Sequence, residues 1–254
     1  MTTTIHRGEA HSPRSIRRDQ TAAGTMLSPA YIVLQPKGGT GKSTVVEQIL
    51  LHLYHSVEKQ IWLIDADLSN PDLYRAHYGS EIKCECVALD SDAGYTTVAR
   101  RLSDPRIDGP IAISTGAGLA EVYARNLGIL DLAAHHAHRS LNVAITIDLD
   151  TDSVIHIQSL REAMPHSVFY VVRPRHFGRP EEFEVFNESD FGQEFLAAKR
   201  VIDLPVMPSA LARRFKTDRK SLISIMQSDD IADRCTLETW APHSRRALSP
   251  LLDW

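Results

Sequence analysis

Short runs of consecutive apolar residues recur along the chain, and stretches with helical spacing lie between several of them. The apolar runs cover residues 31–34, 61–64, 111–113, 143–147, 168–172 and 201–202. Runs of this length without polar alternation predict strands that are buried on both faces. The helical stretches cover residues 119–135, 153–164 and 183–198. Strands that alternate with helices predict an α/β fold with a doubly wound, mostly parallel sheet and helices on both faces.

Residues 1–27 lack apolar periodicity and are predicted to be a flexible N-terminal tail. Arg14, Arg17 and Arg18 make this tail mildly basic, so a solvated leader and an arm that binds DNA or a partner are both open. The remaining residues, 28–254, show no internal repeat and no long linker. They are predicted to form a single domain, with a helical C-terminal part from residue 209 onward.

Composition narrows the classes of protein that need to be considered. Of the 254 residues, 43% are hydrophobic, yet no apolar run is long enough to span a bilayer. We see no secretory signal, and three cysteines are too few for a disulfide framework, so we expect a cytoplasmic protein. The net charge of −4 means that any attraction to DNA must come from a local patch.

Residues 35–44 read Gln-Pro-Lys-Gly-Gly-Thr-Gly-Lys-Ser-Thr, after a predicted strand and at the start of a predicted helix. This is the context of a phosphate-binding loop, in which glycines let backbone N–H groups approach phosphate oxygens. Lys42 would contact the β- and γ-phosphates, Ser43 would ligate Mg²⁺, and Thr44 would lie nearer the α-phosphate. The alternative is a glycine-rich turn that binds no nucleotide. The residues expected to contact nucleotide are Lys37, Gly38, Gly39, Thr40, Gly41, Lys42, Ser43 and Thr44.

A second lysine distinguishes this loop from the ordinary pattern. Pro36 stands where the first glycine is usual, and Lys37 follows it. The loop therefore resembles the deviant Walker A loop of ParA/MinD ATPases. In that family the first lysine reaches across a dimer to the partner's nucleotide, and Lys37 is its match. The resemblance implies an ATPase that binds ATP and Mg²⁺ and forms a homodimer when ATP is bound, with Lys37 and Lys42 as catalytic residues.

Two aspartates end the second predicted strand. Asp65 and Asp67 resemble the Asp-x-Asp of the same family, where a carboxylate orients the attacking water or holds Mg²⁺ through water. We predict that Asp65 is the catalytic and metal-binding member and that Asp67 supports nucleotide binding. The alternative is that the pair caps the helix after Pro71.

The third predicted strand departs from the family pattern. The family commonly has Asp-x-Pro-x-Gly here, and its aspartate completes the Mg²⁺ shell. Ser114 stands in place of that aspartate and Gly116 in place of the proline. Asp148, at the end of the fourth apolar run, is a rival candidate. The order of motifs along the chain favours Ser114.

Later motifs are similar to those of ParA-like ATPases carried by conjugative plasmids, of the TraL and StbB kind. In order, they are Gly116-Ala117, Asp152-Ser153, Arg173 where an Asn is expected, Phe177-Gly178 and Ile202-Asp203-Leu204-Pro205. The resemblance covers residues 30–254. It implies that Arg173 and Pro205 lie at the nucleotide, and an arginine can stack on a base.

Two smaller groups of residues, one of cysteines and one of histidines, could bind a metal ion. Cys84 and Cys86 could be half of a metal site, but the alternation in residues 82–87 is also typical of a strand with both cysteines on one face. His135 and His138 are three residues apart at a predicted helix end, where they could share a face.

A basic cluster lies in the C-terminal part, with only Asp218 opposing it in the sequence. It could be a solvated helix face or a patch that binds DNA without regard to sequence. Its members are Arg213, Arg214, Lys216, Arg219 and Lys220.

Together these features predict an ATP-dependent dimerisation switch in plasmid maintenance, partition or conjugative transfer. Hydrolysis would be slow and stimulated by DNA or by a DNA-binding or relaxase-type partner. Two alternatives stay open: a nucleotide-binding scaffold with little hydrolysis, motivated by Ser114, and a metabolic or metal-handling enzyme on the same fold. The second would need a substrate site or a Cys-x-x-Cys pair, neither of which is found in the sequence.

Overall fold

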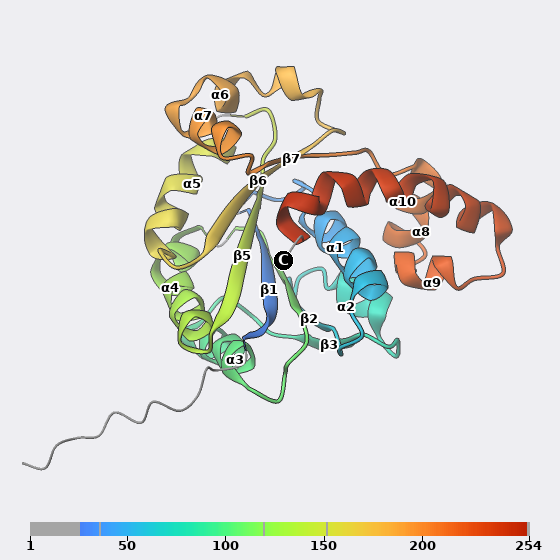
Figure 1. Cartoon of the computed structure of the whole chain (residues 1–254), viewed down its shortest axis with the longest axis horizontal. Coiled ribbons are helices and arrows are strands. Elements are labelled where there is room, and N and C mark those ends of the chain that lie inside the picture. Colours follow the sequence, from blue (N-terminus) through green and yellow to red (C-terminus); the bar gives the residue numbers. More distant parts are fainter. Residues whose placement is uncertain (1–25, 36, 119, 151, 253–254) are drawn as a thin grey trace, which may run out of the picture.

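Parallel strands form one continuous sheet at the centre of the molecule (Figure 1). The computed structural model describes residues 26–35, 37–118, 120–150 and 152–252, so the predicted tail lies almost wholly outside the described residues. The described strands are β1 (Leu27–Leu34), β2 (Trp62–Ala66), β3 (Lys83–Cys86), β4 (Ile111–Thr115), β5 (Arg139–Thr146), β6 (Val168–Pro174) and β7 (Val201–Leu204).

The strand order is β3-β2-β4-β1-β5-β6-β7, and every pairing is parallel. Ile32 in β1 pairs with Ile113 in β4 on one side and with Val143 in β5 on the other. From β1 the chain forms β2 and the edge strand β3, returns to insert β4 between β2 and β1, and then adds β5, β6 and β7 on the other side of β1. In such a sheet, the carboxyl end of the strand at the reversal point is where ligands bind.

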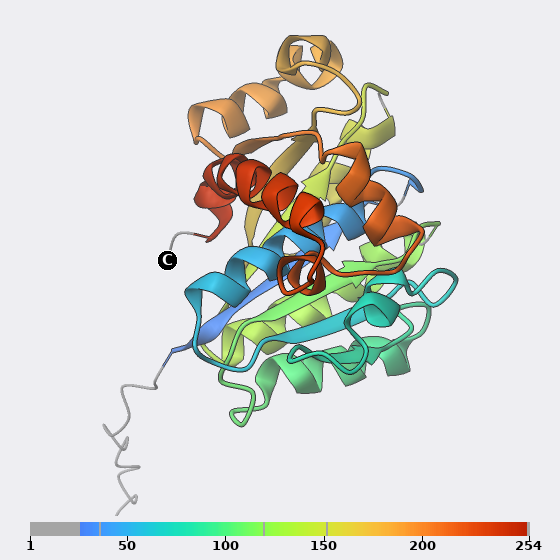
Figure 2. The same cartoon turned by 90° about the vertical axis from the view of Figure 1, so that its right-hand side faces the viewer.

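Helices cover both faces of the sheet (Figures 1 and 2), as the sequence predicted. One face carries α3, α4, α5, α6 and α7, and the other carries α1, α2, α8, α9 and α10. The bounds are α1 (Lys42–Ser56), α2 (Asp72–His77), α3 (Asp92–Ser103), α4 (Ala120–His136), α5 (Asp152–Ala163), α6 (Glu184–Glu188), α7 (Asp190–Ala197), α8 (Ser209–Lys216), α9 (Leu222–Met226) and α10 (Ile231–Leu252), with a 3₁₀ turn at Pro180–Glu182.

The molecule has two hydrophobic cores, one on each face of the sheet, and successive residues of β1 pack alternately into them. Ile32 and Leu34 pack in the core with α4 and α5, whereas Tyr31 and Val33 pack in the core with α1 and α10. All four side chains are buried, which explains why this strand appears in the sequence as an unbroken apolar run. The fold is thus a single α/β domain with a doubly wound parallel sheet.

Some elements differ from the sequence expectation. The predicted helix 183–198 is divided at Ser189, whose hydroxyl accepts a hydrogen bond from the Gly192 amide and begins α7. Residues 83–86 form the edge strand β3, so the strand interpretation of Cys84 and Cys86 is confirmed. None of the described helices is long and apolar enough to cross a membrane.

Candidate functional site

The loop between β1 and α1 has the backbone geometry that phosphate binding requires. Gly39 and Gly41 have φ angles of 78° and 86°, in the left-handed region that favours glycine. Gly41 caps the N-terminus of α1, and within the described part of the chain no side-chain capping bond to the N–H groups of this helix end is found. These amides and the positive end of the helix dipole therefore face the loop, where they can bind an anion.

Lys42 is buried beside these amides. Its Nζ donates a hydrogen bond to the Lys37 carbonyl oxygen over 3.1 Å, and it has no ion-pair partner among the described residues. Burial lowers the pKa of Lys42 to about 8, and the charge of Asp67 partly opposes this shift. A buried ammonium without a carboxylate partner is costly unless an anion neutralises it. The arrangement therefore favours a phosphate ligand.

A cavity of about 510 Å³ opens over the loop, a size typical of small-molecule sites. Most of the predicted nucleotide residues line it: Gly38, Gly39, Thr40, Gly41, Lys42, Ser43, Thr44, Asp67 and Pro205. Sequence reasoning missed other lining residues, among them Gln48, Asn70, Asp72, His176, Phe215 and Lys216. Gln48 could have been found, because it lies one helical turn after Thr44 on the same face of α1.

The two aspartates of the second strand have different surroundings. The Asp65 side chain is buried and accepts hydrogen bonds from the Tyr74 amide over 3.0 Å and the Asp67 amide over 3.3 Å. It thereby caps the first turn of α2, and burial raises its pKa to about 6. Asp67 is half-buried and lines the cavity, whereas Asp65 does not. The geometry thus favours Asp67 over the predicted Asp65 as the carboxylate that reaches a ligand, and gives Asp65 the capping role that was the alternative.

Ser114 lies where the third-strand carboxylate was expected. Its strand, β4, is inserted between β2 and β1, and Ser114 is in register with Asp65 and with Val33. The Ser114 hydroxyl is fully buried and has no hydrogen-bond partner among the described residues. The strand order therefore supports the assignment of Ser114, rather than Asp148, to this position.

Asp148 instead follows β5, on the other side of β1, and pairs with Lys37. The distance from Lys37 Nζ to Asp148 Oδ2 is 2.6 Å, and Asp150 forms a second ion pair with the same ammonium. These carboxylates raise the pKa of Lys37. The lysine lies beside the cavity without lining it.

Arg173, which the resemblance places at the nucleotide, does not line this cavity in the structure. Its guanidinium forms two hydrogen bonds with the Asp203 carboxylate, of 2.7 and 2.9 Å, and a third with the Asn187 side chain, of 2.6 Å. It also lies 5.8 Å from the centre of the Phe183 ring. A buried arginine needs such partners, and they hold it away from the cavity lining.

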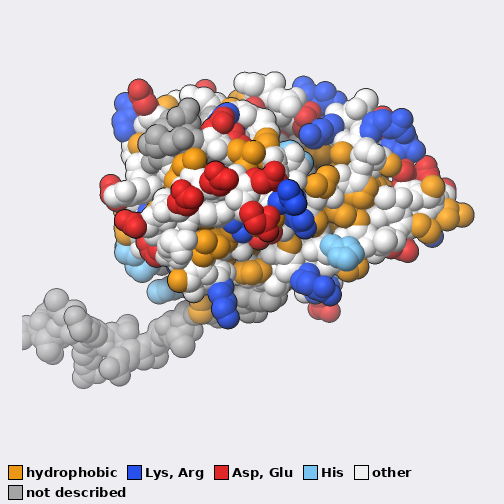
Figure 3. Space-filling model, turned by 90° about the horizontal axis from the view of Figure 1, so that it is seen from above, with side chains coloured by type: hydrophobic (Ala, Val, Ile, Leu, Met, Phe, Trp, Pro, Cys, Tyr) orange, Lys and Arg blue, Asp and Glu red, His pale blue; other side chains and the backbone are white. Residues whose placement is uncertain are grey.

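The arginines of the basic cluster form ion pairs with more acidic side chains than the sequence suggests. Arg214 pairs with Asp218, Asp230 and Asp233, and Arg219 pairs with Asp72 at 3.1 Å. Acidic and basic side chains are also interspersed on the face seen in Figure 3. The exposed members without an ion pair among the described residues are Arg213, Lys216 and Lys220, and Lys216 lines the cavity.

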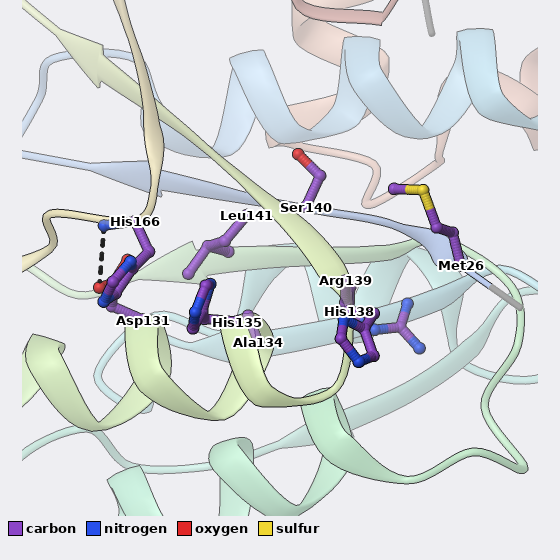
Figure 4. A pocket seen from close by; sticks show the side chains of 9 residues that line it. All are labelled: Met26, Asp131, Ala134, His135, His138, Arg139, Ser140, Leu141 and His166. Carbon is purple, nitrogen blue, oxygen red and sulfur yellow. Dashed lines mark hydrogen bonds between the residues drawn. The ribbon is translucent and has the colours of Figure 1, made fainter. Parts of the chain in front are cut away.

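A second pocket, of about 360 Å³, lies near the start of β5 and contains three histidines (Figure 4). His135 stacks on His166 at 4.0 Å between ring centres, and Asp131 accepts a hydrogen bond from the His166 amide. His138 lies beyond the end of α4 with φ 53°, so it does not share a helix face with His135. No group of three or more His, Cys, Asp or Glu residues suited to a metal occurs in the part of the chain that the structure describes.

Comparison with known proteins gives the fold and one relative. No protein-family model matches the chain. The chain is 25% identical to the protein MobD of Acidithiobacillus ferrooxidans over 228 residues, which is 89% of this chain and 99% of that protein. The solved MinC:MinD cell division protein complex of Aquifex aeolicus is similar with a TM-score of 0.51, 14% identity, and coverage of 85% of this chain and 95% of that one. A ParA family ATPase of Chlorobium tepidum is similar with a TM-score of 0.46, 13% identity, and coverage of 85% and 98%. The likeness to the Aquifex structure shows that this chain shares its fold, a single α/β domain built on a parallel sheet.

Proposed function

We propose that this protein is an ATPase that dimerises when ATP is bound and acts as a switch in plasmid mobilisation, maintenance or partition. The observation that carries the proposal is Lys42, a buried ammonium beside free helix N-terminal amides and without a carboxylate partner among the described residues. The phosphates of ATP provide the negative charge that this site needs. The similarity to MobD over most of both chains supports a mobilisation-related role.

The residues present also suit Mg²⁺ bound together with a nucleotide. The Ser43 hydroxyl and the Asp67 carboxylate both line the cavity and are oxygen ligands of the kind Mg²⁺ prefers. Mg²⁺ usually keeps several waters and uses phosphate oxygens, so a preformed cage of carboxylates is not required. When bound, the ion would neutralise charge on the phosphates.

Hydrolysis would depend on positioning by the protein's own groups. The loop amides and Lys42 would hold the β- and γ-phosphates, and Asp67 would orient a water for attack. Asp65 would act as a positioning residue, because it fixes the Asp67 amide and the first turn of α2. We propose further that Lys37 leaves its own carboxylates and contacts the partner's nucleotide in the dimer.

A second candidate function, a nucleotide-dependent scaffold with little hydrolysis, is favoured by Ser114. Its buried hydroxyl brings no negative charge to the position where a carboxylate was expected. ATP would still bind and drive dimerisation, but turnover would be slow. A steady-state rate measured with and without DNA separates the switch from the scaffold.

The nucleotide site is tested by calorimetry of ATP with Mg²⁺ on the wild type and on Lys42→Ala. Loss of a buried charge-assisted contact costs about 2–5 kcal/mol, so the variant should lose roughly 30-fold or more in affinity. Lys59→Ala is a matched control, because Lys59 is exposed and lies outside the cavity. Unchanged affinity of Lys42→Ala would refute the proposed site.

A further inference from the structure

Among the described residues, a buried side chain that lines the nucleotide cavity has a hydrogen-bond donor without a partner. Gln48 lies on α1, is fully buried and lines the cavity. Its Nε2 atom has no hydrogen-bond partner among the described residues, although it carries two N–H groups. Buried donors are nearly always paired in folded proteins, so this one points to a missing acceptor.

The other end of the same amide is held by α10. The Ser244 hydroxyl donates to Gln48 Oε1 over 2.5 Å and lies 3.0 Å from His52 Nε2. Burial lowers the pKa of His52 to about 4, so at neutral pH the ring is uncharged. The neutral ring can donate from Nε2 to Ser244, which in turn donates to Gln48. These hydrogen bonds engage the oxygen of the Gln48 amide and leave its Nε2 donors for a further acceptor.

The position of Gln48 along α1 determines which part of a bound nucleotide its side chain could contact. Lys42 and Ser43 are at the N-terminus of the helix, where phosphates bind, and Gln48 is six residues after Lys42. At 1.5 Å per residue this is about 9 Å along the axis, beyond the reach of the phosphates. The cavity also has apolar lining from Leu204, Met207 and Phe215, surfaces that suit a sugar or a base.

We infer that the Gln48 amide donates a hydrogen bond to an acceptor on the nucleoside half of the bound nucleotide, a ring nitrogen or a sugar oxygen. This inference rests on the proposed nucleotide site and assigns it a further binding residue. It also links the nucleotide to α10, since Ser244 bonds to the same amide. A bound nucleotide would thereby stabilise the packing of α10 on α1.

The test compares two probes, ATP and inorganic tripolyphosphate, each with Mg²⁺, by calorimetry on the wild type, Gln48→Leu and Gln48→Met. Both variants remove the Nε2 donor and keep most of the side-chain volume. Gln48→Met replaces Gln48→Leu in the test if Gln48→Leu does not fold. Loss of one neutral hydrogen bond should weaken ATP binding about three- to tenfold. Tripolyphosphate binding should be unchanged, because it has no nucleoside. Lys42→Ala should weaken both probes.

Two outcomes would overturn the inference. Equal ATP affinity in wild type and both variants would show that Gln48 makes no contact with the nucleoside. An equal loss for ATP and tripolyphosphate would show that the variants disturb the phosphate loop instead. In either case the proposed nucleotide site would stand. If the wild type bound neither probe, the proposed function itself would fail.

Discussion

Lys37 and Asp148 join the phosphate loop to the segment that follows β5, through an ion pair of 2.6 Å. The Lys37 side chain is 41% exposed, and Asp150 shares its ammonium. Gln35, two residues earlier, adds a further link by donating from Nε2 to the Thr146 carbonyl oxygen. In this form of the molecule the lysine is neutralised by its own chain. A contact with a partner's nucleotide requires these ion pairs to open.

Lys37→Ala should therefore separate binding from assembly. The variant should keep the monomer's ATP affinity, because Lys37 does not line the cavity. It should lose ATP-dependent dimerisation, because the charge that reaches the partner is gone. Light scattering with ATP and Mg²⁺ measures the dimer fraction. Normal dimers in Lys37→Ala would show that the lysine acts only within its own chain.

Asp148→Asn is the complementary change. By weakening the ion pair that holds Lys37, it should raise the dimer fraction at a given ATP concentration, measured by the same method. Asp150→Asn, at a more exposed carboxylate, should have a smaller effect. If Asp148→Asn instead abolished the Mg²⁺ dependence of ATP binding, Asp148 would be the metal-binding carboxylate and the assignment of Ser114 would be wrong.

Asp65 and Asp67 should differ when each is replaced by alanine. Asp67→Ala should slow ATP hydrolysis at least tenfold, because Asp67 is the one of the pair that lines the cavity. Asp65→Ala should lower the free energy of unfolding by about 1–3 kcal/mol, because two partly buried amides lose their acceptor. Turnover assays and denaturant unfolding distinguish the two. A stable Asp65→Ala variant without hydrolysis would support the catalytic role of Asp65 predicted from the sequence.

ATP affinity should fall as the pH rises through the pKa of Lys42, about 8 in the free protein. Below this pH the ammonium is charged and attracts the phosphates; above it the amine becomes neutral. Bound phosphates favour the charged form, so ATP binding takes up a proton and weakens with rising pH. Between pH 7.5 and 9.5 we expect roughly a tenfold or greater loss by calorimetry. Lys42→Ala should bind weakly and without this pH dependence, and an equal dependence in the variant would contradict the assignment.

DNA binding, if present, should depend on Arg213 and Lys220 more than on Arg214. Arg214 is already neutralised by three carboxylates, whereas the other two are exposed and have no ion pair among the described residues. Each lost phosphate contact should reduce the slope of log affinity against log salt by about 0.9. A salt titration of ATP-bound wild type and an Arg213→Gln, Lys220→Gln variant on random duplex DNA tests this. Binding that ATP does not stimulate would leave the cluster as a solvated face.

The strands that could be recognised in the sequence have a central apolar run buried on both faces of the sheet, such as residues 31–34 of β1 and 143–145 of β5. The edge strand β3 lacks that constraint, and its four residues show only weak alternation. The glycines and lysines of the loop between β1 and α1 lie close together in the sequence, so a phosphate site could be predicted there from the sequence alone.

Roles that depend on distant partners could not be identified in this way. Asp65 is turned from the cavity by the Tyr74 amide, nine residues later, and Arg173 is held by Asp203, thirty residues later. Similarly, Asp230 and Asp233 reach Arg214 only because α10 folds back beside α8. Motif spacing does not contain this information.

The most direct test of the switch is the molar mass of the wild-type protein in solution, by light scattering with Mg²⁺ and either no nucleotide, ADP or ATP. The account predicts a monomer of 28.3 kDa without nucleotide and with ADP, and twice that mass with ATP. Calorimetry on the same sample must show that ATP is bound. A mass that stays at the monomer value with ATP bound, or a dimer in all three conditions, would contradict an ATP-dependent dimerisation switch.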